Sequence, residues 1–69
     1  MITLKVELDQ EVDGRWIAEV PDLPGVMSYG RSPEEARAKV QALALRVVAD
    51  RLENGDAGTE LLTITFAPA

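Results

Sequence analysis

The stretch Ser32-Pro33-Glu34-Glu35 marks the point where the chain changes from short strands to one long helix. Ser32 is a favoured N-cap residue, and Pro33 follows at the first helical position, where its missing N–H costs nothing. Glu35 completes a capping box with Ser32, and both glutamates suit the positive end of the helix dipole. The stretch therefore predicts a helix from Pro33 to about Glu53.

The segments before this helix have the patterns of strands. Residues 2–8 alternate between apolar and polar side chains, which is typical of a half-buried strand. Asp13-Gly14 is a hairpin signal, so residues 15–20 are expected to pair back on the first strand. The apolar inward-facing side chains expected in these two strands are Ile2, Leu4, Val6, Leu8, Trp16, Ala18 and Val20.

Two prolines and a glycine interrupt the second strand, and a short third strand at residues 26–30 leads to the helix. Asn54-Gly55 ends the helix, because both residue types tolerate the left-handed conformation of a C-cap. A fourth strand is expected at residues 61–66, with Leu62, Ile64 and Phe66 on one face.

The order strand-strand-strand-helix-strand predicts an α+β fold with two layers, in which one helix covers one face of a four-stranded, mostly antiparallel sheet. A right-handed crossover places the fourth strand beside the first, which gives the spatial order 3-2-1-4. The chain has 69 residues without repeats or a linker, so residues 1–69 are expected to form one domain.

The helix carries two apolar stripes on roughly opposite sides. The predicted core stripe consists of Ala36, Val40, Leu43 and Val47, and the second stripe of Ala38, Leu45, Ala49 and Leu52. The second stripe has two interpretations: exposed alanines and single leucines need no partner, or the stripe packs against another chain. The second interpretation is favoured because a core this small benefits from extra burial, and it makes Leu45, Ala49 and Leu52 candidates for a dimer or tetramer interface.

Composition excludes several classes of function. The chain has no cysteine and no histidine, so it lacks the residues of common zinc sites and the usual general base at neutral pH. We therefore expect no enzyme activity and no cofactor. The net charge of −5 disfavours nucleic acid and favours a basic protein partner, although it can also simply keep a small protein dissolved.

No apolar run is long enough to cross a membrane, and Met1 to Leu8 has no continuous apolar region of the kind found in signal peptides. The cytoplasm is therefore the expected location. Trp16 is expected in the core. Tyr29 is open between core and interface, since the phase of its short strand is uncertain.

Carboxylates are the only groups in the chain that suggest metal-dependent catalysis. Glu7, Asp9 and Glu19 all fall on the outer face of the predicted sheet, where they could bind a divalent metal. The favoured alternative is an ordinary solvated face, because no other catalytic group converges there.

The run from Gly14 to Val26 and the run from Gly30 to Ala36 together resemble the signature of the HicB-like antitoxin family. Shared features are an acidic lead-in, an aromatic residue in the second strand, Pro-Asp-Leu-Pro-Gly at 21–25, and a glycine before a Ser-capped Glu-Glu-Ala helix start. The resemblance covers more than half of the chain in the same order and spacing. It implies a sheet-plus-helix fold, partly like a double-stranded-RNA-binding domain or the start of an RNase H fold.

The resemblance further implies that the chain binds and blocks a small basic HicA-like toxin, a ribonuclease that cleaves mRNA. HicB-like antitoxins usually continue into a DNA-binding domain; we expect none here and no operator binding. The contact candidates are Pro21, Asp22, Leu23, Pro24, Gly25 and Tyr29, although these prolines and the glycine can equally serve only to shape a turn. The alternative function is a self-assembling homo-oligomer without a toxin.

Overall fold

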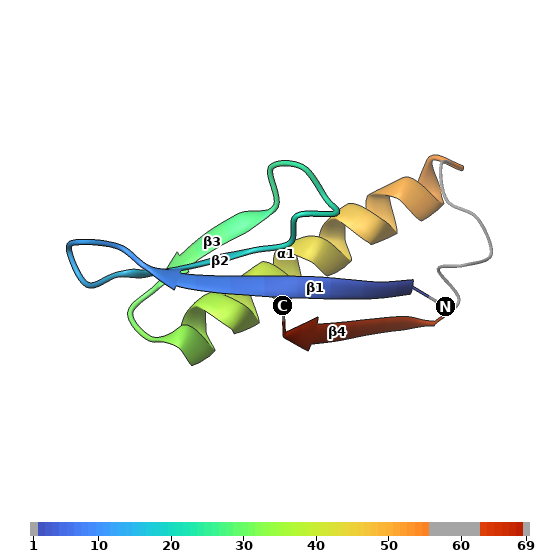
Figure 1. Ribbon diagram of the computed structural model, residues 1–69. Coiled ribbons are helices and arrows are strands. Elements are labelled where there is room, and N and C mark those ends of the chain that lie inside the picture. The colour runs from blue at the N-terminus through green and yellow to red at the C-terminus, as the bar shows by residue number, and fades with distance from the viewer. Residues whose placement is uncertain (1, 56–62, 69) are drawn as a thin grey trace.

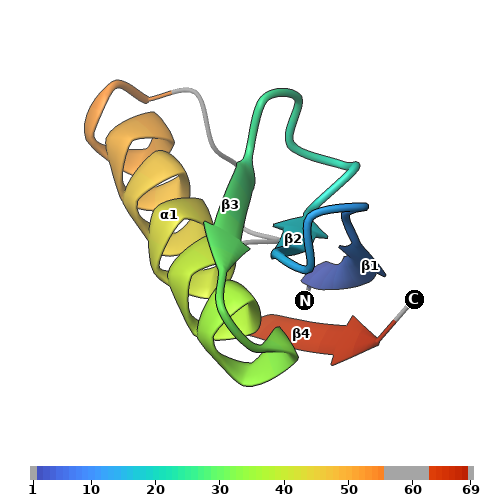
Figure 2. The same ribbon diagram turned by 90° about the vertical axis from the view of Figure 1, so that its left-hand side faces the viewer.

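One helix packs along one face of a four-stranded sheet, as the views in Figures 1 and 2 show. This computed structural model describes residues 2–55 and 63–68. Its elements are β1 (Ile2–Gln10), β2 (Trp16–Glu19), β3 (Met27–Gly30), α1 (Pro33–Glu53) and β4 (Ile64–Pro68).

The order of the strands in the sheet is β3-β2-β1-β4, and this confirms the predicted α+β topology. β2 pairs antiparallel with both β1 and β3, whereas β4 lies parallel to β1. The long strand β1 is shared between two partners, because β4 pairs with Ile2 to Val6 and β2 pairs with Glu7 to Gln10. The two pairings lie on opposite sides of β1 and hardly overlap along it.

The bounds of the strands differ from those predicted. β1 continues to Gln10, which pairs with Trp16, because the hairpin ladder extends past the last apolar residue. β4 ends at Pro68 instead of Phe66, a position that an edge strand tolerates. The predicted positions Leu61 and Leu62 lie outside the described residues. Ile64 and Phe66 pack against the core from one face of β4, as predicted.

Small side chains bring the helix close to the sheet. The buried helix residues are Ala36, Val40, Ala44 and Val48, which recur every fourth position. Of the core stripe predicted from the sequence, Ala36 and Val40 are buried, whereas Leu43 and Val47 are only partly buried and pack against the core beside this row. The core also receives Leu4 and Val6 of β1, Ala18 of β2 and Val20, which directly follows β2. Trp16 packs against this core, as predicted.

Gly30 allows the start of α1 to approach β3. A Cβ atom at this position would overlap the backbone nitrogen of Ala36 and lie 2.9 Å from its Cα. The same turn is held by Ser32, whose Oγ accepts a hydrogen bond of 3.1 Å from the backbone N–H of Glu35. The predicted capping box is modified, because the Glu35 carboxylate accepts from the N–H of Arg31, at 3.0 Å, instead of that of Ser32.

Candidate protein-binding surface

The face of the sheet opposite α1 carries a small grid of exposed and half-exposed side chains. Cross-strand pairing aligns Glu7 with Glu19 and Asp9 with Ile17. It also aligns Glu19 with Met27 and Ile17 with Tyr29. We call this set the open face: Glu7, Asp9, Ile17, Glu19, Met27 and Tyr29. Among the described residues, no helix or strand covers it.

The open face is acidic on one side and apolar on the other. Glu7 and Asp9 of β1 are exposed, and Glu19 of β2 is half-buried. At the far edge, Met27 and Tyr29 of β3 are each 42% exposed, more than is usual for side chains of this size in a core. Because neighbouring strands lie about 4.8 Å apart, the carboxylates and the apolar side chains fall within a single patch about 10 Å wide.

A cation already stacks on this patch. The guanidinium of Arg15 lies 4.5 Å from the centre of the Tyr29 ring, within the range of a cation–π contact. Its Nε also donates to Asp13 at 2.8 Å. The backbone N–H of Arg15, which donates to the same carboxyl, is the main cause that holds the pKa of Asp13 below its ordinary value. Tyr29 therefore lies on the surface, where the sequence left its position open.

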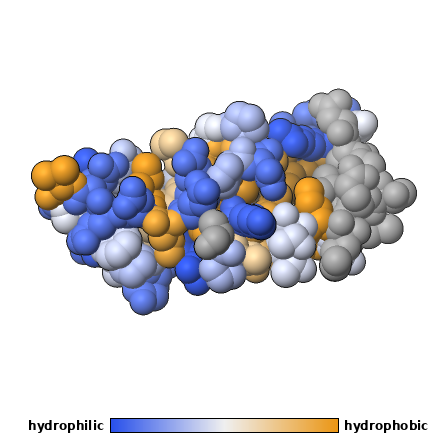
Figure 3. Space-filling model, in the orientation of Figure 1, coloured by the Kyte–Doolittle hydropathy of each residue, from blue (hydrophilic) through white to orange (hydrophobic). Residues whose placement is uncertain are grey.

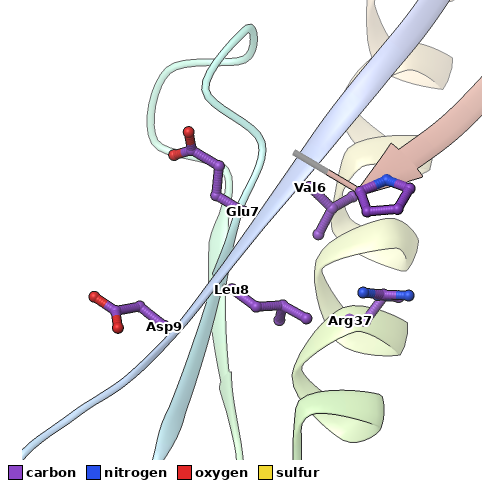
Figure 4. Close-up of a pocket in the computed structure, with 6 residues that line it drawn as sticks. Val6, Glu7, Leu8, Asp9 and Arg37 are labelled. Atoms are coloured by element: carbon purple, nitrogen blue, oxygen red, sulfur yellow. The ribbon is translucent and has the colours of Figure 1, made fainter.

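The carboxylates of the open face do not gather into a metal site. Within residues 2–55 and 63–68, no group of three acidic side chains is arranged to hold a metal ion. Glu7 and Asp9 are two positions apart on β1, and both side chains extend into solvent on the same side of the sheet (Figure 4). The metal-binding interpretation of Glu7, Asp9 and Glu19 is therefore not supported by their geometry.

In the connector between β2 and β3, some residues lie in the core and others lie on the surface. Leu23 is only 5% exposed and belongs to the core, so its prediction as a partner contact is corrected. Backbone hydrogen bonds of 3.0 Å, from Leu23 to the Val20 carbonyl and from Val26 to the Leu23 carbonyl, hold it inward. The other connector residues, Pro21, Asp22, Pro24 and Gly25, are exposed.

The second stripe of the helix is on the surface. Leu45 is 48% exposed and Leu52 is 51% exposed, and Ala49 between them is exposed as well. Figure 3 shows hydrophobic side chains that reach the surface as separate patches among hydrophilic ones. The stripe therefore stays available as the predicted oligomer interface.

A shallow cavity lies where β1 runs past the end of β4 (Figure 4). Its lining comes from three elements that are distant in the sequence: Val6, Glu7, Leu8 and Asp9 of β1, Arg37 of α1 and Pro68 of β4. The sequence did not indicate this site, because β1 was predicted to end at Leu8 and β4 at Phe66. Because Asp9 and Gln10 are both polar, the apolar–polar alternation did not show that the strand continues through them.

In comparisons with protein-family models, with curated proteins and with solved structures, nothing matches this chain. Within residues 2–55 and 63–68, no helix combines the length and the apolar character needed to span a bilayer. What the chain binds must therefore be inferred from its own surface.

Proposed function

We propose that this chain is a non-enzymatic binding domain of the HicB-like antitoxin type. In this proposal, its open face docks a small basic protein in the cytoplasm, and that partner is a HicA-like toxin that cleaves mRNA. The observation that carries the proposal is the open face itself, where three carboxylates adjoin exposed apolar side chains and no described element covers them.

Carboxylates that lie opposite each other on neighbouring strands make this face favourable for binding cations. Glu7 and Glu19 are direct partners across β1 and β2, and such a pair destabilises a sheet by a few tenths of a kcal/mol or more. Asp9 adds a third carboxylate one position further along the same face. A lysine or arginine placed between these groups removes the repulsion, so a basic surface gains more than it would from isolated acids.

The apolar side chains beside the carboxylates favour a protein partner that also has an apolar patch. Met27 and Tyr29 present flexible and aromatic contact area, and both residue types are common at the centres of interfaces. The guanidinium of Arg15 already stacks on the Tyr29 ring, so Tyr29 offers contact area and not a free site for a second cation. A basic protein with an exposed arginine beside an apolar patch matches both halves of the open face.

The non-enzymatic part of the proposal is supported by the residue types present. The chain contains neither histidine nor cysteine, and its one buried row of side chains on α1 is entirely apolar. None of the buried residues in the described segments is polar or charged. Active sites usually need at least one such group held away from water, with its pKa adjusted to the reaction.

The proposal is tested by co-expression with a small, basic, His-containing HicA-like protein from a neighbouring gene. A stable acidic–basic complex, seen by light scattering, that lacks the ribonuclease activity of the free toxin supports it. Two species that elute separately, with the ribonuclease still active in the mixture, refute it.

A second candidate function is self-assembly without a toxin, favoured by the exposed stripe on α1. Replacing Leu45 and Leu52 by lysine should then convert a homo-oligomer into monomers, as measured by light scattering. The pair Asp50→Asn and Glu53→Gln is the matched control, because it changes the net charge by the same two units at exposed helix positions outside the stripe. Equal masses for all three proteins would remove this candidate.

A further inference from the structure

β3 forms one edge of the sheet, and its outer side pairs with no strand among residues 2–55 and 63–68. Its place does not depend on either end of the sequence, because the segments that precede and follow it, residues 20–26 and 31–32, are both described. The strand order puts β2 and β1 between β3 and β4 (Figures 1 and 2). The outer side of β3 is therefore a surface of its own, remote from the edge that β4 forms.

Hydrogen-bonding directions show which main-chain groups of β3 face outward. The N–H of Val20 donates to the carbonyl of Val26 at 3.0 Å, so these two residues form a hydrogen-bonded pair. Such pairs alternate with non-bonded pairs along an antiparallel ladder. In the register of β2 and β3, Met27 and Tyr29 fall on the non-bonded positions, one and three residues beyond Val26. Their N–H and C=O groups therefore point away from β2, toward the outer edge.

The sequence of β3 does not have the features that usually protect an edge strand. Edge strands are commonly protected by charged residues, by proline or by a bulge. β3 reads Met27-Ser28-Tyr29-Gly30, without charge or proline, and it pairs with β2 residue for residue. Its two large side chains, Met27 and Tyr29, are exposed on the open face beside this edge. The main chain of β3 is therefore accessible to an added strand.

A hollow of about 480 Å³ lies beside the Gly30 end of this edge, and most of its lining side chains are charged. The lining consists of Tyr29 and Gly30 of β3, Arg15 before β2, Arg31 after β3, and Glu35 and Lys39 of α1. These residues come from both faces of the sheet. Because β2 occupies the inner side of β3, they meet at its outer side.

Positive charge is in excess around the hollow, although the chain as a whole carries a net charge of −5. Arg31 and Lys39 share one carboxylate, that of Glu35, at 3.2 and 3.6 Å. Arg15 pairs with Asp13 at 2.8 Å. Among these five side chains, positive charge exceeds negative charge by one. The side chains of Arg31 and Lys39 are 91% and 57% exposed, so both can turn toward an incoming carboxylate.

We propose that β3 accepts an extended acidic segment of a second protein as an added strand, with carboxylates of that segment beside the hollow. Main-chain bonds to Met27 and Tyr29 would form the ladder, and the side chains of the added strand would alternate between the two faces of the sheet. On the open face they lie beside Met27 and Tyr29, which favour apolar residues. On the helix side they lie toward Arg31 and Lys39, which favour glutamate or aspartate. The preferred segment therefore alternates apolar and acidic residues.

A second copy of the chain matches this site less well. Two β3 strands that paired with each other would bring only the sequence Met-Ser-Tyr-Gly, which has no carboxylate. The excess positive charge beside Gly30 would then gain no partner from the added strand. The site also differs from the carboxylates of β1 and β2 that attract a basic protein, so the proposed function and this inference are tested independently of each other.

The test uses the full chain and the peptide Val-Glu-Val-Glu-Val-Glu, blocked at both ends, with binding followed by NMR and amide hydrogen exchange. Control peptides are the block isomer Val-Val-Val-Glu-Glu-Glu, the lysine peptide Val-Lys-Val-Lys-Val-Lys, and the alternating acidic peptide with N-methyl groups on either its valines or its glutamates. The N-methyl groups remove the donors on one side of the peptide without changing its charge.

Two variants of the chain test the charge of the hollow. Arg31→Gln/Lys39→Gln removes two of its cations. The matched control is Arg46→Gln/Arg51→Gln, which changes the net charge equally at exposed positions of α1 outside the hollow. Light scattering measures the mass of the free chain.

We expect the alternating acidic peptide to shift the amides of Met27 and Tyr29 and to slow their exchange by about tenfold or more. The block isomer, the lysine peptide and one of the two N-methylated peptides should bind about tenfold more weakly or worse. Arg31→Gln/Lys39→Gln should weaken binding by about fivefold or more relative to its control.

Three results would overturn the inference: equal binding of all the peptides, no binding of the alternating acidic peptide, or equal effects of the two variants. A free chain that is already a dimer, with slow amide exchange at Met27 and Tyr29, would overturn it in favour of a second copy at this edge.

Discussion

Replacing Gly30 with alanine tests how closely β3 and the first turn of α1 are packed. The added Cβ would overlap the backbone nitrogen of Ala36, lie 2.9 Å from its Cα and 3.0 Å from the carbonyl carbon of Glu35. All three atoms belong to the backbone of a capped helix, so none can rotate away. Relief requires the strand and the helix to separate by roughly 1 Å to reach the 3.5–4.0 Å of an ordinary carbon contact.

Such a separation loosens the whole helix–sheet interface, because the neighbouring buried residues are small and make close contacts. Overpacking in a tight interior costs about 1–3 kcal/mol, and the rigid surroundings put Gly30→Ala near the upper end. A chain of 69 residues has a total stability of about 3–10 kcal/mol. We therefore expect Gly30→Ala to lower the melting temperature by about 10–20 °C.

Thermal and urea denaturation followed by circular dichroism measure this loss. Ser28→Ala is the matched control, because Ser28 lies two positions earlier on the same face of β3 and the substitution adds no volume. A Gly30→Ala protein that unfolds within about 0.5 kcal/mol of the control would refute the close approach of β3 and α1.

Three further perturbations test the helix and its packing. Ser32→Ala removes the acceptor for the Glu35 N–H and should cost about 1 kcal/mol in urea denaturation; no loss would contradict the cap. Hydrogen bonds from Arg31 lower the pKa of the Glu35 carboxyl, so the wild type should lose stability as the pH falls from the ordinary carboxyl range through this lowered pKa. Glu35→Gln should reduce the slope of stability against pH in this range, and parallel curves for the two proteins would refute this. Val40→Ala should lower the free energy of unfolding by about 2–3 kcal/mol, because Val40 is fully buried, whereas Leu45→Ala at a half-exposed position should lower it by less than about 0.5 kcal/mol. Equal losses for the two variants would contradict the burial of Val40.

Local signals made the helix and the topology predictable. Ser32 and Pro33 fix the start of α1 through their own chemistry, without help from distant residues, and the structure begins the helix at Pro33. The strand order followed from the handedness of the crossover, which limits where β4 can lie once the first three strands form a meander.

Packing decided what the sequence did not reveal. Leu23 lies in a proline-rich connector that resembles an exposed turn, yet the turn directs this one side chain into the core. Ala44 and Val48, not Leu43 and Val47, are buried in α1, because the small side chains allow the helix to lie closest to the sheet along that row. The apolar pattern does not show which two of these four helix residues are buried, since all four are apolar.

The candidate surface was predictable only in part. The alternation in β1 placed Glu7 and Asp9 on the outer face, and the structure confirms that both are exposed. Their apolar neighbours depended on the register of β3, which is four residues long and has no clear period of its own.

The measurement that tests the open face most directly is the affinity of a basic HicA-like protein for three versions of this chain. The versions are the wild type, the open-face variant Glu7→Lys/Asp9→Lys and the control variant Asp50→Lys/Glu53→Lys, which changes the net charge equally on the exposed end of α1. We expect the open-face variant to lose ~30-fold or more in affinity and the control to lose less than ~5-fold, because only close charge pairs contribute strongly to binding. Equal losses in the two variants, or no loss in either, would contradict docking on the open face.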